Sequence, residues 1–318
     1  IDGAAYNVAI GYAAGQNISS GYNNTIIGGL AGDSLSTGLA NTALGYQALG
    51  AEDTGGRNTA IGYQALLSLD VGGDGFNVAV GYNAAANQTT GIHNVIIGNL
   101  AGDALTTSGY NVAIGSGALG AEDTRGGSVA VGFEALTAQN ADADTYNVAV
   151  GYEAGHDVST GIKNTIIGNR AGDALTTGSN NTIIGSAAAA SAVDVSNEIT
   201  LGDSNVSAIR AQVTSISSLS DKRDKKEIKD SVYGLDFVNN LKPVTFEWDQ
   251  RDGNRSGVKD VGFIAQDLQK IDDEYTRLVY DSNPDKLEAT YGRLIPIMAK
   301  AIQELSAEVK QLKEKLNG

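Results

Sequence analysis

The stretch YNVAIGYAAGQNISSG, residues 6–21, recurs with small changes through the first two thirds of the chain. Two related stretches, FNVAVGYNAAANQTTG (76–91) and YNVAVGYEAGHDVSTG (146–161), begin two further copies of a 70-residue unit. Within each unit a shorter motif, Asn-x-[Ala/Ile/Thr]-[Ile/Val/Leu]-Gly, recurs at intervals of 17, 17, 17 and then 19 residues. A fixed period of this length is typical of a solenoid, in which each rung packs only on its neighbours.

Each rung has the pattern of one short strand closed by a turn. A β-prone run of period two precedes the motif glycine, and a segment rich in Ser, Thr, Gly and Asp follows it. The twelve motif glycines, from Gly11 to Gly202, predict twelve rungs, and eleven of them have Ala three residues later. This small residue indicates close packing against the opposite wall of the coil or a neighbouring chain. At ~4.8 Å per rung, parallel stacking predicts a rod of about 50 Å.

Ten of the twelve rungs have Asn four residues before the motif glycine, and Ser128 and Glu198 occupy the other two positions. Stacked rungs align such amides into a ladder, in which each side chain bonds to the next backbone or amide. The predicted ladder consists of Asn7, Asn24, Asn41, Asn58, Asn77, Asn94, Asn111, Asn147, Asn164 and Asn181.

Charge divides the chain near residue 220. Residues 1–219 hold 5 Lys or Arg against 18 Asp or Glu, whereas residues 220–318 hold 17 against 19. We therefore predict a β-solenoid shaft over 1–205, a linker over 206–219, a small α+β domain over 220–294 and a coiled-coil helix over 295–318. The net charge of −15 argues against nucleic-acid binding, which needs a basic face. The chain has no cysteine and no long apolar run, so we expect neither disulfides nor membrane insertion.

The segment after residue 220 mixes helical and strand patterns. SVYGLDFVNNL has helical spacing, VTFEW resembles a strand, and DVGFIAQDLQKI resembles a strand that runs into a helix. The last segment repeats apolar residues in steps of three and four, which predicts a coiled coil of about three heptads. β-branched residues at one seam position and Leu at the other favour a dimer in an isolated peptide. A trimeric domain before the helix could override this preference. The predicted seam is Ile295, Met298, Ile302, Leu305, Val309, Leu312 and Leu316.

The repeats are similar to those of a known family of trimeric proteins. SVAVGFEA (128–135), and more loosely every NVAIGYxA, resembles the head repeat of trimeric autotransporter adhesins, which form a parallel β-roll. The rungs here are longer than the family's. The resemblance implies a trimer and exposure at a surface.

Four ordered blocks carry a second resemblance: SDKRDK (220–225), LKPVTFEW (241–248), DVGFIAQDL (260–268) and YGRLIPIMAKAIQEL (291–305). Together they resemble the intramolecular chaperone of phage tailspikes and tail fibres, the peptidase S74 family. That family trimerises, guides the folding of the β-structured shaft before it and then cuts itself off. By this resemblance Ser220 is the nucleophile, Lys225 the general base and Leu219–Ser220 the scissile bond. Asp221 and Arg223 match the remaining motif positions and would hold the loop.

The resemblance thus implies a homotrimeric tail fibre of a virion, with a self-cleaving chaperone made in the host cytoplasm and then released. The shaft would be a spacer or would bind a host receptor or glycan. Alternatives are a cellular trimeric surface adhesin with an uncleaved trimerisation domain, and a monomeric solenoid that binds ice or polysaccharide. We predict no cofactor and no metal.

Two surface patterns leave alternatives open. The acidic pairs Glu52/Asp53 and Glu122/Asp123 lie one 70-residue unit apart in predicted turns. We expect their side chains to be solvated, and the alternative is that they bind Ca²⁺. Tyrosines also recur just after the motif glycine, and packing between rungs is favoured for them over a ligand-facing stripe. These tyrosines are Tyr12, Tyr46, Tyr63, Tyr82 and Tyr152.

Overall fold

The computed structural model describes residues 6–122, 124–206, 208–210, 212, 220–250 and 256–317. The chain divides into two compact units, Ile1–Asp203 and Ser204–Gly318. Each unit is described by itself below.

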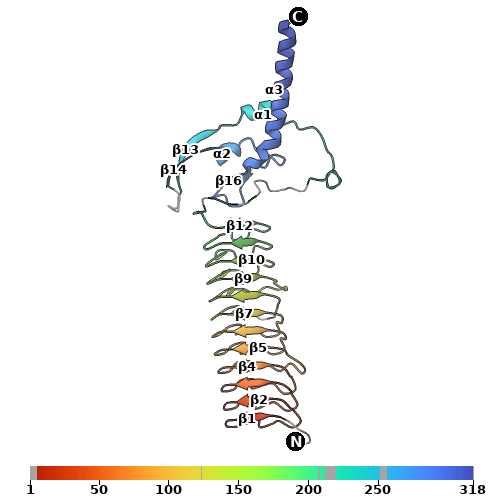
Figure 1. Cartoon of the computed structure of the whole chain (residues 1–318), viewed down its shortest axis with the longest axis vertical. Coiled ribbons are helices and arrows are strands. Elements are labelled where there is room, and N and C mark those ends of the chain that lie inside the picture. The colour runs from red at the N-terminus through yellow and green to blue at the C-terminus, as the bar shows by residue number, and fades with distance from the viewer. Residues whose placement is uncertain are drawn as a thin grey trace. The chain divides into compact units, whose positions relative to one another are not determined.

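The first unit is a β-solenoid in which each rung contributes one three-residue strand. Its strands form one parallel sheet in sequence order, so the chain completes a circuit of 17 or 19 residues between neighbours (Figure 1). This confirms the predicted solenoid. The strands are β1 (Val8–Ile10), β2 (Thr25–Ile27), β3 (Thr42–Leu44), β4 (Thr59–Ile61), β5 (Val78–Val80), β6 (Val95–Ile97), β7 (Val112–Ile114), β8 (Val129–Val131), β9 (Val148–Val150), β10 (Thr165–Ile167), β11 (Thr182–Ile184) and β12 (Ile199–Leu201).

The interior of the solenoid is filled by the middle residue of each strand and by the alanine that follows the motif glycine. From β2 to β11 the middle residue is fully buried, as Ile26, Ala113 and Ile166 show. The alanines from Ala31 to Ala188 are equally buried within the single chain. They therefore pack against the opposite wall of their own coil, which decides between the two explanations left open by the sequence.

The motif glycines stack directly on one another. Gly115 has φ +137°, and a Cβ at this position would lie 2.1 Å from the carbonyl oxygen of Gly132 in the next rung. Any side chain here would collide with backbone and would also strain φ. Glycine is therefore required at this position of the rung for two independent reasons.

The asparagines form a hydrogen-bonded ladder inside the solenoid. Asn94 Oδ1 accepts a hydrogen bond from the backbone N–H of Asn111 at 2.9 Å, and Asn94 Nδ2 donates to the carbonyl oxygen of Ser108 at 2.8 Å. The rung-to-rung bond repeats from Asn7 to Glu198, and Ser128 Oγ replaces the amide oxygen in its rung. The amide oxygens thus satisfy buried backbone donors in the next rung, and most of the amide nitrogens also brace their own rung. Asn58 Nδ2 is an exception, because it is buried without a partner.

The second unit is a small α+β domain, as predicted, with two antiparallel two-stranded sheets and a C-terminal helix. The strands β13 and β14 cover the predicted segments VTFEW and DVG. The two-residue strands β15 and β16 were not predicted. The elements are η1 (Lys222–Asp224), α1 (Leu235–Asn239), β13 (Val244–Asp249), β14 (Ser256–Gly262), α2 (Ala265–Leu268), β15 (Val279–Tyr280), β16 (Glu288–Ala289), η2 (Tyr291–Arg293) and α3 (Leu294–Asn317).

The core of the second unit is small and lies along one face of α3. Its buried members are Leu268, Leu278, Leu294 and Ile297. Helix α3 also holds α1, because Glu304 Oε2 accepts a hydrogen bond from the backbone N–H of Leu235 at 2.7 Å. Among the described residues, no helix is long and apolar enough to cross a membrane.

A different face of α3 carries the seam predicted from the heptads. Every seam residue is exposed in the single chain, from 41 % for Val309 to 83 % for Leu316. The helix thus uses one face for its own domain and leaves a second apolar face to solvent.

Candidate functional site: a serine and a lysine on one turn

The side chains of Ser220 and Lys225 meet. Lys225 Nζ donates hydrogen bonds to Ser220 Oγ at 2.5 Å and to the carbonyl oxygen of Ser220 at 3.3 Å. The segment between them is the single 3₁₀ turn η1, and Lys225 leaves it in an extended conformation. Five residues along a regular helix would place the two side chains on different faces. The tight turn followed by extended backbone brings them together instead.

Asp221 and Arg223 hold this turn. The Asp221 carboxylate caps η1 by accepting from the backbone N–H of Arg223 at 2.8 Å, and it also accepts from Arg223 Nη2 at 2.6 Å. The hydrogen bond from the Arg223 side chain, followed by that from its backbone, lowers the pKa of Asp221, and the same contact raises the pKa of Arg223. The pair is therefore charged and paired over a wide pH range.

The Ser220–Lys225 pair has the geometry for proton transfer but lies in solvent. Ser220, Lys225 and the neighbouring Lys222, Lys226 and Lys229 are all exposed. Water and salt screen the effect of neighbouring cations on an exposed amine. A lysine acts as a base only when burial or nearby charge favours its neutral form. The predicted scissile bond includes Leu219, which lies outside the described residues.

The tyrosines after the motif glycines pack on one another. The rings of Tyr46, Tyr63 and Tyr82 stack in a column with centroid separations of 5.5 and 5.2 Å. The ring faces that meet in this column are covered, and Tyr152 stacks in the same way on Phe133. Tyr12, in the first rung, is 83% exposed. Packing between rungs is therefore the role that the structure gives the stacked rings. A sugar that stacks on an aromatic side chain needs an open ring face.

Sequence reasoning missed a second aromatic column. Phe76, His93 and Tyr110 stack with centroid separations of 5.0 and 5.1 Å, and the Arg57 guanidinium lies over Phe76. These residues occupy the position just before each ladder asparagine. Aligning the rungs on that asparagine would have shown the column.

Two carboxylates predicted to be solvated are buried, and for them the prediction was wrong. Glu52 Oε1 accepts from the backbone N–H of Gly55 at 2.6 Å, and burial raises the pKa of Glu52. Glu122 Oε2 accepts from Gln139 Nε2 at 2.9 Å. The turn directs both side chains inward, where backbone and amide donors satisfy them. Among the described residues, no group of three His or acidic side chains is placed to hold a metal ion.

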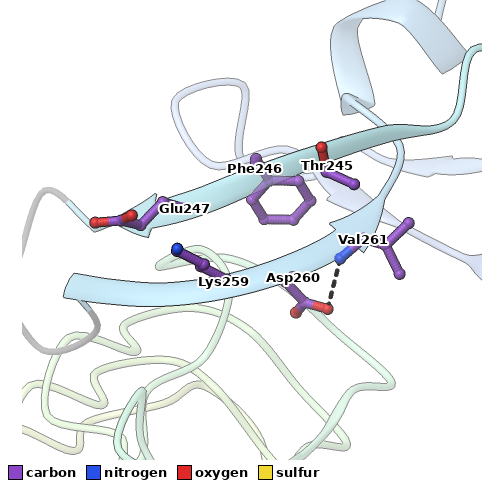
Figure 2. A pocket seen from close by; sticks show the side chains of 6 residues that line it. All are labelled: Thr245, Phe246, Glu247, Lys259, Asp260 and Val261. Atoms are coloured by element: carbon purple, nitrogen blue, oxygen red, sulfur yellow. Dashed lines mark hydrogen bonds between the residues drawn. The ribbon is translucent and has the colours of Figure 1, made fainter.

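An open pocket of about 580 Å³ lies on the β13–β14 ribbon. Figure 2 shows Glu247 and Lys259 on adjacent strands beside the Phe246 ring, and Asp260 Oδ1 accepting from the Val261 N–H at 2.8 Å. Phe246 also packs edge-on against Trp248, with ring centroids 5.1 Å apart. The described lining of this pocket contains neither Ser220 nor Lys225.

A loop near α2 is fixed by a carboxylate and a tyrosine. Tyr233 Oη donates to Asp273 Oδ2 at 2.6 Å, which raises the pKa of Tyr233 to about 12 and lowers that of Asp273. Burial works to raise the pKa of Asp272, but hydrogen bonds from Thr276 and from three backbone N–H groups outweigh it and lower that pKa. These contacts hold the segment between α2 and β15 in place.

Comparison with known proteins places this turn inside a defined family region. Residues 220–279 match the peptidase S74 family, described as the chaperone of endosialidase. The long tail fiber protein Gp37 of Enterobacteria phage M1 is 36% identical over 96 residues, which are 30% of this chain and 38% of that protein. Its counterpart in Enterobacteria phage Ox2 is 37% identical over 93 residues, 29% of this chain and 36% of that protein.

The chain thus spans little more than a third of the length of these relatives. No solved structure matches the chain significantly. The match begins at Ser220, the first residue of the Ser–Lys turn, and ends at Val279 in β15. It confirms the resemblance predicted from the sequence: a β-solenoid followed by a chaperone-of-endosialidase domain, as in a phage tail fibre.

Proposed function

We propose that this chain is part of a homotrimeric phage tail fibre, whose C-terminal domain assembles the fibre and then cuts the bond between Leu219 and Ser220. One observation supports the cleavage above the others: Lys225 Nζ lies 2.5 Å from Ser220 Oγ at the start of the matched region. The names of the two relatives support a virion tail as the location.

The proposed reaction is an intramolecular acyl shift followed by hydrolysis. Neutral Lys225 takes the proton of the Ser220 hydroxyl, and Oγ attacks the carbonyl carbon of Leu219 through a five-membered ring. The C–N bond then breaks, the Ser220 amine leaves with the proton, and an ester joins Leu219 to Ser220 Oγ. One water hydrolyses this ester to give the Leu219 carboxylate and the free Ser220 hydroxyl. The Asp221–Arg223 pair keeps the turn in the shape that holds Oγ against Nζ.

Assembly would supply the desolvation that the single chain lacks. In one chain the Ser220–Lys225 pair is exposed, and so is the α3 seam. Three copies that join through α3 would crowd their domains around a common axis and could bury the pair. Coverage by partner copies would favour the neutral amine. Cleavage would then follow assembly, so that an unassembled chain keeps its chaperone.

The order of events follows from folding physics. A parallel solenoid in three chains must find the same register three times, a slow process with exposed edges. A terminal trimeriser raises the local concentration of the chains and sets their register. Removing it afterwards would trap the fibre kinetically. The chaperone would be made in the host cytoplasm and released, and the shaft would remain as spacer or host-receptor binder.

The test is intact mass of the freshly purified chain and of three variants, measured under denaturing and native conditions. We expect fragments that end at Leu219 and begin at Ser220 in the wild type, and one uncut mass for Ser220→Ala and Lys225→Ala. Lys226→Ala, which removes a neighbouring exposed lysine, should cut like the wild type. If the wild type is an uncut native trimer, the cleavage proposal is wrong and the C-terminal domain is a permanent trimerisation domain. If Ser220→Ala is cut as well as the wild type, Ser220 is not the nucleophile.

A further inference from the structure

The outer face of the twelve-stranded sheet is an uncharged strip of aliphatic residues interspersed with threonine. In every strand the first and third residues point away from the interior, and all of them are exposed or half-buried in the single chain. The third position is Ile, Val or Leu in every rung from Ile10 to Leu201. The first position is Val, Thr or Ile throughout. We call these two columns of residues the strand face.

The strand face carries no charge, although the solenoid as a whole is strongly acidic. Residues 1–219 hold 18 acidic and 5 basic side chains, and every one of them lies outside these two columns. Chance alone would place some of them there, because exposed strand positions readily accept Lys, Glu and Asp. Depletion of charge together with enrichment in apolar residues is the composition of an interface centre.

We propose that the strand face is where the shafts of neighbouring copies of this chain pack together, parallel and in register. The inference deepens the proposed homotrimer by naming the surface that joins the shafts, and it rests on that proposal.

Two properties of the face favour a second copy over another partner. An identical parallel copy presents the same rung spacing, so the aliphatic column of third residues meets its counterpart along the whole length of the sheet. Two acidic shafts also repel each other wherever their charged turns approach, and the uncharged face avoids this cost. A bound glycan would need polar groups or open aromatic faces. The only polar side chains of the face are threonines, and the rings of Tyr46, Tyr63 and Tyr82 are stacked on one another.

The exposed area is large enough for a stable interface. Ile10 is 59% exposed, Leu44 44% and Ile167 39%. Summed over the two columns, the exposed area is on the order of 1,000 Å² per copy, which matches what one partner contributes to a standard protein interface. An apolar strip of this size marks an interaction surface.

The chain has no cysteine, so a thiol-specific crosslinker would react only at an introduced cysteine. We would introduce single cysteines into the full-length Ser220→Ala chain, so that the C-terminal domain stays attached. Val95→Cys and Ile97→Cys place a thiol at the two outward positions of β6, and Thr107→Cys places one on an exposed turn of the same rung. Each sample receives a short bismaleimide crosslinker, followed by a denaturing gel, with native mass measured in parallel.

The expected result is a trimeric native mass for all three variants, with covalent dimers for Val95→Cys and Ile97→Cys and none for Thr107→Cys. A trimeric mass with no crosslink on β6, or with equal crosslinking at Thr107→Cys, would overturn this inference and leave the proposed trimer intact. A monomeric native mass would overturn both. A trimer whose β6 thiols react freely with a monofunctional maleimide would mean that the face has no occupant, again contradicting the inference alone.

Discussion

The two units of this chain reach stability in different ways. Each rung of the solenoid buries its alanines and strand centres against its own coil, and the Asn ladder satisfies backbone donors from rung to rung. The second unit buries few apolar side chains in its core and leaves the whole α3 seam in solvent. The contrast indicates that the interior of a rung is complete within one chain, whereas the C-terminal unit leaves the apolar face of α3 uncovered. This division agrees with the proposal that the C-terminal unit assembles before the shaft folds.

The largest effect should come from the glycine stack. We expect Gly115→Ala to destabilise the solenoid by about 4 kcal/mol, because the new methyl group would meet the Gly132 carbonyl and φ would be strained. Thermal or denaturant unfolding followed by circular dichroism measures this. Gly73→Ala is the matched control, since nothing lies within 4 Å of its Cβ position. If the two variants are equally stable, the motif glycines do not stack as closely as described.

The next largest effect should come from the exposed seam of α3, which belongs to the second unit alone. Ile302→Asp combined with Leu305→Asp puts charge into the exposed seam, and we expect it to weaken trimer formation about 100-fold, or about 3 kcal/mol. Gln303→Asp with Ser306→Asp adds the same charge at other exposed positions of α3 and should leave assembly nearly unchanged. Sedimentation over a dilution series distinguishes them. If both pairs behave alike, the seam is not the contact between copies.

A smaller loss should follow removal of one ladder amide. Asn164→Ala leaves the buried N–H of Asn181 without its acceptor and the carbonyl of Gly178 without its donor, which should cost about 2 kcal/mol. Hydrogen exchange should show the loss in the rungs around β10 and β11. Asn169→Ala, at an exposed position of the same rung, should have little effect. Unchanged protection at Asn181 would show that the ladder adds little.

The smallest effect depends on pH. Burial raises the pKa of Glu52 above its ordinary value of 4.5, so the native state binds this proton more tightly than the unfolded chain. The stabilisation that protonated Glu52 adds to the free energy of unfolding is therefore fully present below pH 4.5. It is lost as the pH rises through the raised pKa, by about 1.4 kcal/mol for each pH unit between the two pKa values. Relative to Glu52→Gln, the wild type should gain stability on acidification from pH 7. A constant difference between the two melting curves would refute this.

The rungs could be predicted from the sequence because a solenoid is encoded locally. The spacing of the motif glycines gives the circuit length, and the asparagine before each strand indicates its ladder. The burial of Glu52 and Glu122 was missed because side-chain direction in a turn depends on backbone conformation rather than on period. Gly55 and Arg125, whose N–H groups the two carboxylates accept from, gave no signal in the sequence.

The second unit was predictable mainly through resemblance. Heptad spacing alone located α3, but a five-residue separation between Ser220 and Lys225 does not determine whether the side chains meet. The contact depends on η1 and its Asp221 cap, a turn too short to leave a periodic pattern. The strands β15 and β16 are also too short for periodicity, and their pairing is set by tertiary contacts.

The edge-on contact between Phe246 and Trp248 has a practical consequence, because Trp248 is the only tryptophan in the chain. The indole emission of this protein originates wholly from the C-terminal unit, whereas the solenoid contributes only tyrosine fluorescence. Residues 1–219, freed of the chaperone, would show only tyrosine fluorescence. Folding, cleavage and release could thus be followed without a label, from the ratio of tryptophan to tyrosine emission.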